Sequence, residues 1–356
     1  MLVLDLLSLP LIDSATHGVD GHYYAKKQAA LVLASLIIMA LGAFADYRDF
    51  VNLSPWIYGG SCVLLVLVLI VGQEVNGATR WISLGVFPLQ PSELAKLAVI
   101  LFYAGFLSRW EDPPSSYRDI LLAYGWILVP AALIMKQPDL GSALTLVAAA
   151  TGCTYMSGTP GDKMAKLAAA FLVLVVGSVL LHVYAGLPLP LADYQVKRLV
   201  SLFSAHEDPL GTGYQVLQSK IAIGSGALWG KGLGKGTQNR LDFIPEQHTD
   251  FIFSVVGEEL GFVKTVLVLG VYVLLMYRCL VAATTSPDRK GTLVAGGVLS
   301  LFLFHVLVNV GMTMGIMPVT GVPLPFLSHG GSALLVDSFM VGMVLNVGWK
   351  RHKIFF

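Results

Sequence analysis

Long apolar runs recur along the chain and are separated by short polar or Gly- and Pro-rich segments. Runs of about 15–25 residues match the length of helix that crosses about 30 Å of hydrocarbon. The pattern therefore predicts an all-α, polytopic integral membrane protein with about ten transmembrane helices. The predicted spans are residues 1–12, 29–45, 56–72, 92–108, 119–136, 140–158, 163–185, 250–277, 291–317 and 331–349. The first is too short to cross alone, so it is expected to continue to Thr16 or to begin upstream.

Composition agrees with a membrane protein, because 55% of the residues are hydrophobic, 13% are charged and the mean hydropathy is +0.72. Soluble domains carry about 25% charged residues, so a water-soluble protein is excluded. The net charge of +1 gives no indication of nucleic-acid binding. The cysteines Cys62, Cys153 and Cys279 lack metal-ligand spacing and are expected to be apolar fillers rather than disulfide partners. No signal peptide is predicted.

The distribution of Lys and Arg between loops predicts the orientation of the spans. With the N-terminus inside, the short inner loops and tail contain eleven such residues and the short outer loops contain four. The inner set is Arg48, Arg109, Arg118, Lys163, Lys166, Arg278, Arg289, Lys290, Lys350, Arg351 and Lys353, and the outer set is Lys26, Lys27, Arg80 and Lys136. Both termini are therefore predicted to be cytoplasmic. Residues 1–356 form one membrane domain in this interpretation, with one long extracytoplasmic loop at 186–249.

The long loop carries two patterns of its own. Apolar Leu217, Ile221 and Leu228 fall on one helical face with Gly224, which predicts an interfacial helix lying on the membrane. A glycine-rich stretch follows, but it fits neither the phosphate-binding loop nor the dinucleotide fingerprint. We expect a flexible loop there, with diphosphate binding by backbone N–H groups near Lys231 and Lys235 as the alternative. The glycines are Gly224, Gly226, Gly230, Gly232, Gly234 and Gly236.

Several ionisable residues lie in or beside the spans, where such residues usually face a cavity or a partner. Glu93 and Lys96 are three residues apart and share one helical face. They form either a self-neutralising pair or part of a functional site. Asp139 lies in a tight outer turn and would cap the next helix or serve the site. Asp337 and Lys264 lie inside spans, and the sequence identifies no partner or role for them.

Asp250 lies where the long loop enters a span, directly before Phe251, Ile252 and Phe253. Partial desolvation at such a boundary favours a carboxylate that can accept a proton, as a general base must. The alternative is a carboxylate that only stabilises the dipole of its own helix. The sequence pattern leaves both interpretations open.

Several motifs occur in order along nearly the whole chain and together resemble one family. They are Arg80-Trp81, Gln90–Lys96, Gln137–Gly141, Gly230–Gly232 with Gly236–Gln238, Pro245–Phe253 with Gly257–Gly261, and Pro318–Ser328 with Gly330–Ser332. The chain resembles the SEDS family (shape, elongation, division and sporulation) of peptidoglycan glycosyltransferases. The segment Pro318–Ser328 and the short tails are similar to the elongation branch, RodA, rather than the division branch, FtsW.

The resemblance implies polymerisation of lipid II, a disaccharide pentapeptide linked to undecaprenyl diphosphate. The family's catalytic carboxylate falls on Asp250, and residues important for activity map onto Glu93 and Lys96 and, less directly, onto Arg80 and Asp139. An oxocarbenium-like transition state needs a carboxylate, and a leaving diphosphate needs cations. Lys96 and Arg80 are the first choices for these cations, with Lys197, Arg198 and Arg240 as candidates from the long loop. The expected substrate-binding residues are Arg80, Glu93, Lys96, Asp139, Lys197, Arg198, Lys231, Arg240 and Glu258.

The same resemblance implies partners and a location. A class B penicillin-binding protein, which is a single-span transpeptidase, would cross-link the strands, and other elongation-complex membrane proteins would join it. The expected location is the bacterial cytoplasmic (inner) membrane, with the active site facing outward. A divalent cation such as Mg²⁺ or Mn²⁺ would assist the leaving group in one version of the mechanism, although no ligand spacing demands a metal.

Two other functions remain open at this point. A lipid flippase or transporter would also have ten spans and buried charges, but it should collect its polar groups near the midplane. A polymerase should collect them at the outer boundary, where Arg80, Glu93, Asp139 and Asp250 are predicted to lie. A non-catalytic scaffold would tolerate replacement of Asp250.

Overall fold

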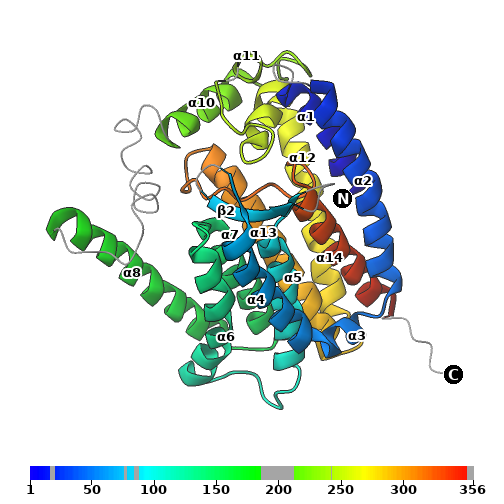
Figure 1. The fold of residues 1–356 in the computed structure, drawn as a ribbon, viewed down its shortest axis with the longest axis vertical. Helices are drawn as coiled ribbons and strands as arrows, with labels where there is room; N and C mark the ends of the chain where they lie inside the picture. Colours follow the sequence, from blue (N-terminus) through cyan, green and yellow to red (C-terminus); the bar gives the residue numbers. More distant parts are fainter. Residues whose placement is uncertain (17–20, 76–77, 84–87, 186–211, 242, 351–356) are drawn as a thin grey trace.

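Apolar runs form helices in a membrane because a helix satisfies its own backbone hydrogen bonds. The computed structural model describes residues 1–356 except 17–20, 76–77, 84–87, 186–211, 242 and 351–356 (Figure 1). Its helices are α1 (Leu2–Ala15), α2 (Gly21–Phe44), α3 (Tyr47–Asn52), α4 (Ser54–Val71), α5 (Pro91–Leu107), α6 (Tyr117–Met135), α7 (Leu140–Met156), α8 (Gly161–Ala185), α10 (Thr212–Ser225), α11 (Thr237–Arg240), α12 (Ile252–Thr284), α13 (Arg289–Thr313) and α14 (Gly331–Lys350). Each predicted span overlaps one of these helices, although some bounds differ, as for α2, predicted at 29–45, and α12, predicted at 250–277.

Six of the described helices are long and apolar enough to cross a membrane by length and composition: α2, α4, α6, α12, α13 and α14. This result confirms a helical, multi-pass membrane protein. Helix α1 has 14 residues, which agrees with the expected shortness of the first span. Helices α5 and α7 have 17 residues each and pack inside the bundle.

The centre of the bundle is formed by α12, α13 and α14, which pack against α2, α5 and α7. Glycines permit the closest approach, between α2 and α14. A Cβ atom on Gly42 would lie 2.7 Å from the carbonyl oxygen of Phe339, and one on Gly342 would overlap the carbonyl of Met39. Small residues at such crossings are the usual means by which membrane helices come together.

A small antiparallel sheet was not predicted. Strands β1 (Gln73–Val75), β2 (Ala78–Ser83) and β3 (Pro88–Leu89) pair in the order β1-β2-β3 between α4 and α5. Strands of two to six residues are too short to show a clear alternation of apolar and polar positions. The sheet matters because β2 carries Arg80.

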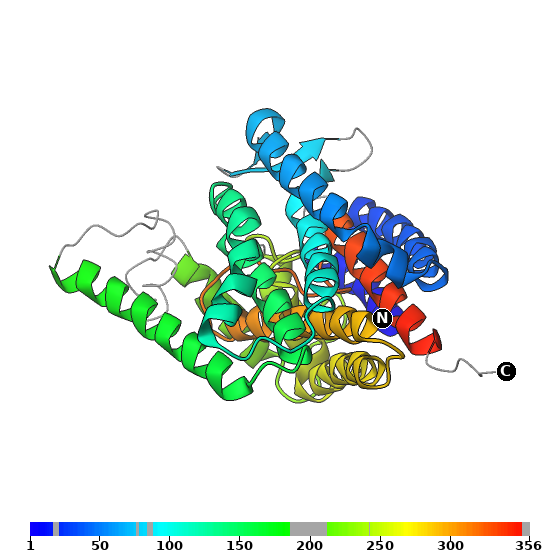
Figure 2. The ribbon, with the colours of Figure 1, turned by 90° about the horizontal axis from the view of Figure 1, so that it is seen from below.

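Helix α8 extends away from the bundle in both views (Figures 1 and 2). It makes hardly any contacts with the other described elements. Its apolar side chains are therefore largely exposed, with Phe171 at 63% and Val173 at 71%. An apolar helix without protein neighbours is suited to a lipid environment rather than to water.

Helix α12 is interrupted at Gly261, where φ is 74°. Backbone groups freed by a break inside a membrane protein need new partners. The glycine loop, residues 226–236, supplies them through four backbone hydrogen bonds: Phe262 N–H to Ala227 O (2.9 Å), Val263 N–H to Leu228 O (3.1 Å), Lys231 N–H to Glu258 O (3.1 Å) and Gly232 N–H to Glu259 O (3.0 Å). This segment is thus a fixed part of the fold, contrary to the expectation of a flexible loop.

A helix is present where the interfacial helix was predicted, as α10, which packs on α12 and lies across one end of the bundle with α11 (Figure 1). It ends at Ser225, so Leu228 of the predicted face lies in the turn that follows. Leu217 and Ile221 on its outer face are 47% and 43% exposed, whereas Ser219 and Ala222 on its inner face are buried. The exposed apolar face agrees with the predicted placement of this helix at the membrane surface.

Candidate functional site

Asp250 lies one residue before Phe251, the N-cap of α12, and is half-buried. This is the predicted position at the junction of loop and helix. Its carboxylate faces the segment before α14, because a Cβ atom on Gly321 would lie 3.3 Å from Asp250 Oδ2. Gly321 has a φ of 73°, a conformation that glycine adopts without strain. The glycine therefore leaves the space beside the carboxylate unfilled.

Arg80 and Asp139 meet at the same end of the bundle. Arg80 Nη1 lies 3.9 Å from Asp139 Oδ2, and its other nitrogens donate to the carbonyls of Gln137 (3.0 Å) and Pro138. Asp139 caps α7 by accepting from the backbone N–H of Ser142 at 3.1 Å, which confirms the capping interpretation. The contacts of Arg80 thus connect strand β2 of the sheet to the turn between α6 and α7.

The turn also connects to Asp250. A Cβ atom on Gly141 would lie 2.5 Å from the carbonyl oxygen of Thr320, the residue that precedes Gly321. Arg80, Asp139, the 320–321 backbone and Asp250 therefore form one continuous set of neighbours. Arg80 and Asp139 are 59 residues apart in the sequence and Asp139 and Asp250 are 111 apart, and the structure brings the three together.

Glu93 and Lys96 lie inside the bundle as an ion pair, with 2.7 Å between Lys96 Nζ and Glu93 Oε1. Lys96 is 1% exposed and Glu93 is 2% exposed. His305 Nε2 lies 3.5 Å from the same ammonium group. Asp337 is buried near this pair, where the Lys96 ammonium attracts its carboxylate and the Glu93 carboxylate repels it. Removing both charges from water is costly, so the attraction within a buried ion pair offsets that cost only when the geometry of the pair is good.

Glu258 is fully buried and holds the glycine loop. Its Oε1 accepts from Lys231 Nζ at 2.6 Å and from the backbone N–H groups of Thr237 and Gln238 at 2.8 and 3.0 Å. Glu259 accepts from the N–H of Gly234 at 3.1 Å. The structure thus engages Lys231 and Glu258, both expected to bind substrate, in a contact that shapes the loop.

The remaining candidates differ in their surroundings. Arg240 ends α11 and is exposed. Lys197 and Arg198 lie outside the described residues. Lys264, unexplained by the sequence, lies beside the break in α12 and donates to the carbonyl of Trp229 at 3.4 Å. Within the described ranges, no group of three or more His, Cys, Asp or Glu side chains is placed to hold a metal ion.

Sequence reasoning missed a cluster of three rings that includes His248, two residues before Asp250. Tyr24 lies 5.3 Å from His248 and 5.5 Å from His329 between ring centroids, and the two histidines are 5.9 Å apart. Burial, together with the nearby His248 and Lys27, lowers the pKa of His329 to about 4. This imidazole is therefore neutral at pH 7.

Sequence reasoning also missed Asn309 on α13, whose side chain is fully buried and donates to the carbonyl of Asp250 at 2.8 Å. The available signal was a polar side chain inside an otherwise apolar span, which usually marks a specific interaction.

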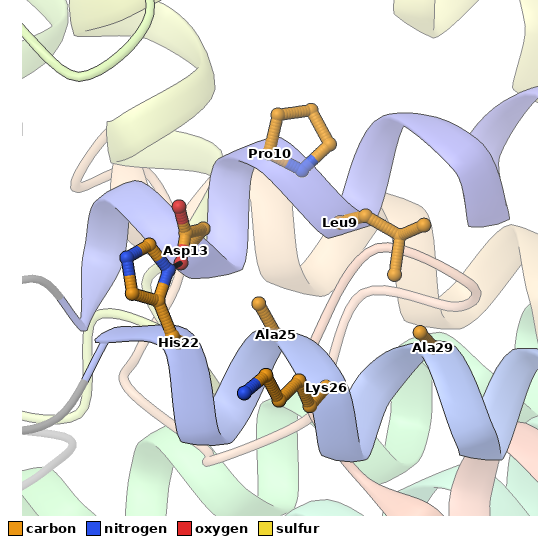
Figure 3. Close-up of a pocket in the computed structure, with 7 residues that line it drawn as sticks. All are labelled: Leu9, Pro10, Asp13, His22, Ala25, Lys26 and Ala29. Carbon is orange, nitrogen blue, oxygen red and sulfur yellow. Dashed lines mark ion pairs between the residues drawn. The ribbon is translucent and has the colours of Figure 1, made fainter.

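A separate groove lies between α1 and α2 and has a volume of about 360 Å³ (Figure 3). It is lined by Leu9, Pro10, Asp13, His22, Ala25, Lys26 and Ala29. His22 Nδ1 lies 3.3 Å from Asp13 Oδ1 at one end. None of the predicted site residues lines this groove, so it is distinct from the neighbourhood of Asp250.

Comparisons with known proteins identify relatives over nearly the whole chain. The peptidoglycan glycosyltransferase MrdB of Escherichia coli K12 is 39% identical over 92% of this chain and 86% of its own length. Stage V sporulation protein E of Bacillus subtilis is 38% identical over 92% of this chain and 87% of its own.

Solved structures agree. The rod shape determining protein RodA of Thermus thermophilus matches with a TM-score of 0.69 and 31% identity over 99% of this chain and 95% of its own. A chain from a study of polymerization and crosslinking by a peptidoglycan synthase complex matches with a TM-score of 0.81 and 30% identity, over 99% and 98% of the two chains. The model of the FtsW/RodA/SpoVE cell cycle proteins matches residues 1–353. The chain therefore belongs to the FtsW/RodA/SpoVE family, the SEDS proteins that its motifs resemble, with RodA-like members among its relatives.

Proposed function

We propose that this chain is a peptidoglycan glycosyltransferase that polymerises lipid II into glycan strands for cell elongation and rod shape. Relatives named peptidoglycan glycosyltransferase and the likeness to RodA support the activity. The observation that carries the proposal is the convergence of Arg80, Asp139 and the carboxylate of Asp250 around the 320–321 backbone at one end of the bundle.

In the proposed reaction, Asp250 accepts the proton of the acceptor GlcNAc 4-hydroxyl as its oxygen attacks C1 of the donor MurNAc. The new C1–O bond forms while the bond from C1 to the diphosphate breaks, and its electron pair leaves with undecaprenyl diphosphate. The negative charge of Asp250 also stabilises the oxocarbenium character of the transition state. A half-buried site strengthens this electrostatic effect because less water competes.

Of the expected cationic residues, Arg240 is our first choice for binding the diphosphate. Its side chain is exposed, and the described residues form no ion pair with it. Lys197 and Arg198 remain proposals for the same role. Arg80, at 19% exposure, is a second choice because its donors already hold two carbonyls. Lys96 and Lys231 are engaged by Glu93 and Glu258, so their contact with the diphosphate stays a prediction.

The Mg²⁺ or Mn²⁺ alternative also stays a prediction. The described acidic and histidine side chains do not form a three-membered donor set, so they do not fit a metal site built by the protein alone. We therefore assign no step of the reaction to a metal ion.

We propose that the single domain 1–356 crosses the bacterial inner membrane ten times, with both termini cytoplasmic and Asp250 facing outward. Loops assigned to the cytoplasm gather at one end, which supports placing them on one side of the membrane. Arg48 Nε pairs with Asp288 at 2.6 Å and Lys290 contacts Asn52 at 2.6 Å. The glycine loop and α11 lie at the opposite end, with the start of α12 (Figure 1). The long loop 186–249 would then be extracytoplasmic.

A class B penicillin-binding protein is the partner that we propose for cross-linking, together with other elongation-complex membrane proteins. The matching chain from a peptidoglycan synthase complex comes from a study of coordinated polymerization and crosslinking, which supports this type of partner.

The competing proposal, a flippase or transporter, draws on the buried cluster of Glu93, Lys96, His305 and Asp337. These side chains are at most 2% exposed, so the structure shows them enclosed rather than lining an accessible midplane path. Polar groups at the end of the bundle favour the enzyme.

The test is polymerisation of labelled lipid II by the purified protein, with its transpeptidase partner made inactive for cross-linking. Wild type should give polymer, and Asp250→Asn should give none while still folding and binding the partner. Polymer from both proteins would remove Asp250 as the base. Lipid II flipping by wild type without polymer would establish the transporter instead.

A further inference from the structure

The backbone that leads into Asp250 is held from the C-terminal part of the chain. Three consecutive carbonyls, at residues 248–250, each accept a hydrogen bond from a donor far away in sequence. The donors are His329 N–H to His248 O (2.9 Å), Ser328 Oγ to Thr249 O (2.6 Å) and Asn309 Nδ2 to Asp250 O (2.8 Å). Three such bonds in succession fix both the position and the rotation of this turn.

Asn309 differs from the other two donors because it makes two bonds at once. Its Nδ2 also donates to the carbonyl of Val322 at 2.8 Å, so both amide hydrogens are used. The orientation of the amide follows from this, since a flipped amide would set its oxygen against two carbonyl oxygens. Its Oδ1 is buried without a partner among the described residues, which is unfavourable. An apolar residue at position 309 would avoid that unfavourable term but would leave the carbonyls of Asp250 and Val322 without this donor.

The two carbonyls bound by Asn309 belong to the two sides of the site. One is that of Asp250 itself. The other is that of Val322, which follows Gly321, the residue that faces Asp250 Oδ2. A single buried side chain therefore sets the spacing between the carboxylate and the backbone opposite it.

We propose that Asn309 is a positioning residue for glycosyl transfer, which orients Asp250 toward the acceptor hydroxyl by fixing both of these backbones. This inference rests on the proposed function of Asp250. A reacting group displaced by about 1 Å typically loses about 100-fold in rate, so loss of the two bonds should act on the chemical step.

The chain offers a matched control in Asn346 on α14. This side chain is also buried, donates to the carbonyl of Ala43 at 2.7 Å and accepts from the N–H of Tyr47 at 3.3 Å. It joins two backbone segments at the opposite end of the bundle, away from Asp250. Loss of its bonds should affect stability without changing the orientation of the base.

The experiment compares Asn309→Leu, Asn309→Ser and Asn346→Leu in the full chain, in complex with its cross-linking-inactive partner. It measures kcat and KM for lipid II, thermal unfolding, and hydrogen exchange of the backbone amides in 246–253. Asn309→Leu should lower kcat by about 100-fold with little change in KM, and should speed exchange at Thr249 and Asp250. Asn309→Ser, which keeps one donor, should fall between Asn309→Leu and wild type, and it carries the test if the leucine variant does not fold.

Asn346→Leu should unfold at a lower temperature and keep the kcat of wild type. Wild-type kcat in the Asn309 variants, or an equal fall of kcat in Asn346→Leu, would overturn the proposal. Asp250→Asn is measured alongside to separate the two ideas. An inactive Asp250→Asn with a fully active Asn309→Leu rejects the positioning role alone, whereas an active Asp250→Asn rejects the base and the positioning role together.

Discussion

The turn that carries Asp250 and the glycine loop beside the break in α12 are both fixed by hydrogen bonds, but in opposite ways. At the turn, the backbone carbonyls accept from donors elsewhere in the protein. At the glycine loop and the start of α11 that follows it, the carboxylates are themselves the acceptors. Glu259 accepts from the N–H of Gly234, and Glu258 accepts from those of Thr237 and Gln238. Acidic residues only a few positions apart thus contribute differently. Glu258 stabilises structure through its side chain, whereas Asp250 is oriented through its main chain.

The largest expected effect is the loss of polymerisation in Asp250→Asn, a substitution that keeps the shape of the side chain and removes its basicity. Polymerisation should fall by about 100- to 10,000-fold, the usual contribution of a general base. The unfolding temperature should hardly change, because the bonds that fix the turn reach the backbone. The checks are polymer yield and thermal unfolding of the purified protein. A large loss of stability would break the contrast with Glu258.

Glu258→Gln should show the opposite result. Glutamine keeps an acceptor oxygen but removes the buried negative charge, so Lys231 loses its ion-pair partner. Breaking such a pair costs about 3–5 kcal/mol of unfolding free energy. Activity per folded molecule should be largely kept. Denaturant unfolding in detergent, paired with kcat corrected for the folded fraction, measures both quantities. A fully stable but inactive variant would instead indicate a direct role for Glu258 in substrate binding.

Gly261→Ala tests the glycine loop through its backbone. A Cβ atom there would overlap the backbone of Gly230, and the φ of 74° is unfavourable for alanine, so a loss of about 2 kcal/mol or more is expected. Gly270→Ala, on the same helix with no atom within 4 Å of the new Cβ, is the control. That change should be neutral or stabilise by up to about 1 kcal/mol. Equal destabilisation by the two substitutions would mean that the break in α12 is not held by the loop.

The smallest effect concerns pH and the Asp250 turn. The pKa of His329 is lowered to about 4 by burial and by His248 and Lys27, so the unfolded chain binds more protons between about pH 4 and 6.5. Stability should therefore fall as the pH is lowered through that window. His329→Gln should reduce this slope in unfolding temperature measured from pH 7 to 5. An unchanged slope in His329→Gln would place the pH sensitivity elsewhere.

Hydropathy predicted where helices occur, because the requirement to cover about 30 Å of hydrocarbon acts on each segment separately. It also placed Asp250 correctly at the start of α12. The short strands β1 to β3 were missed, since two to six residues give no period. The Glu93–Lys96 pair could be predicted as a local contact, but the approach of His305 to it depends on how α5 and α13 pack.

The motifs showed which segments matter without showing what they do. Pro318–Ser328 carried the family resemblance, yet only the structure reveals that Gly321 leaves space beside Asp250 and that Ser328 holds Thr249. Asn309 lies outside all the motifs that carried the resemblance. Its importance arises from two carbonyls that meet only after α12 and α13 have packed, and such long-range pairings leave no periodic signal in a single sequence.

The separation of α8 from the rest of the bundle has a consequence for evolution. Substitutions between apolar residues along this helix exchange one lipid contact for another, whereas the same changes in α13 would open voids in a packed core. Sequences of related proteins should therefore diverge most rapidly at the exposed positions of α8, with overall apolar character retained. Its tilt should also follow the thickness of the host membrane, since few protein contacts oppose such an adjustment.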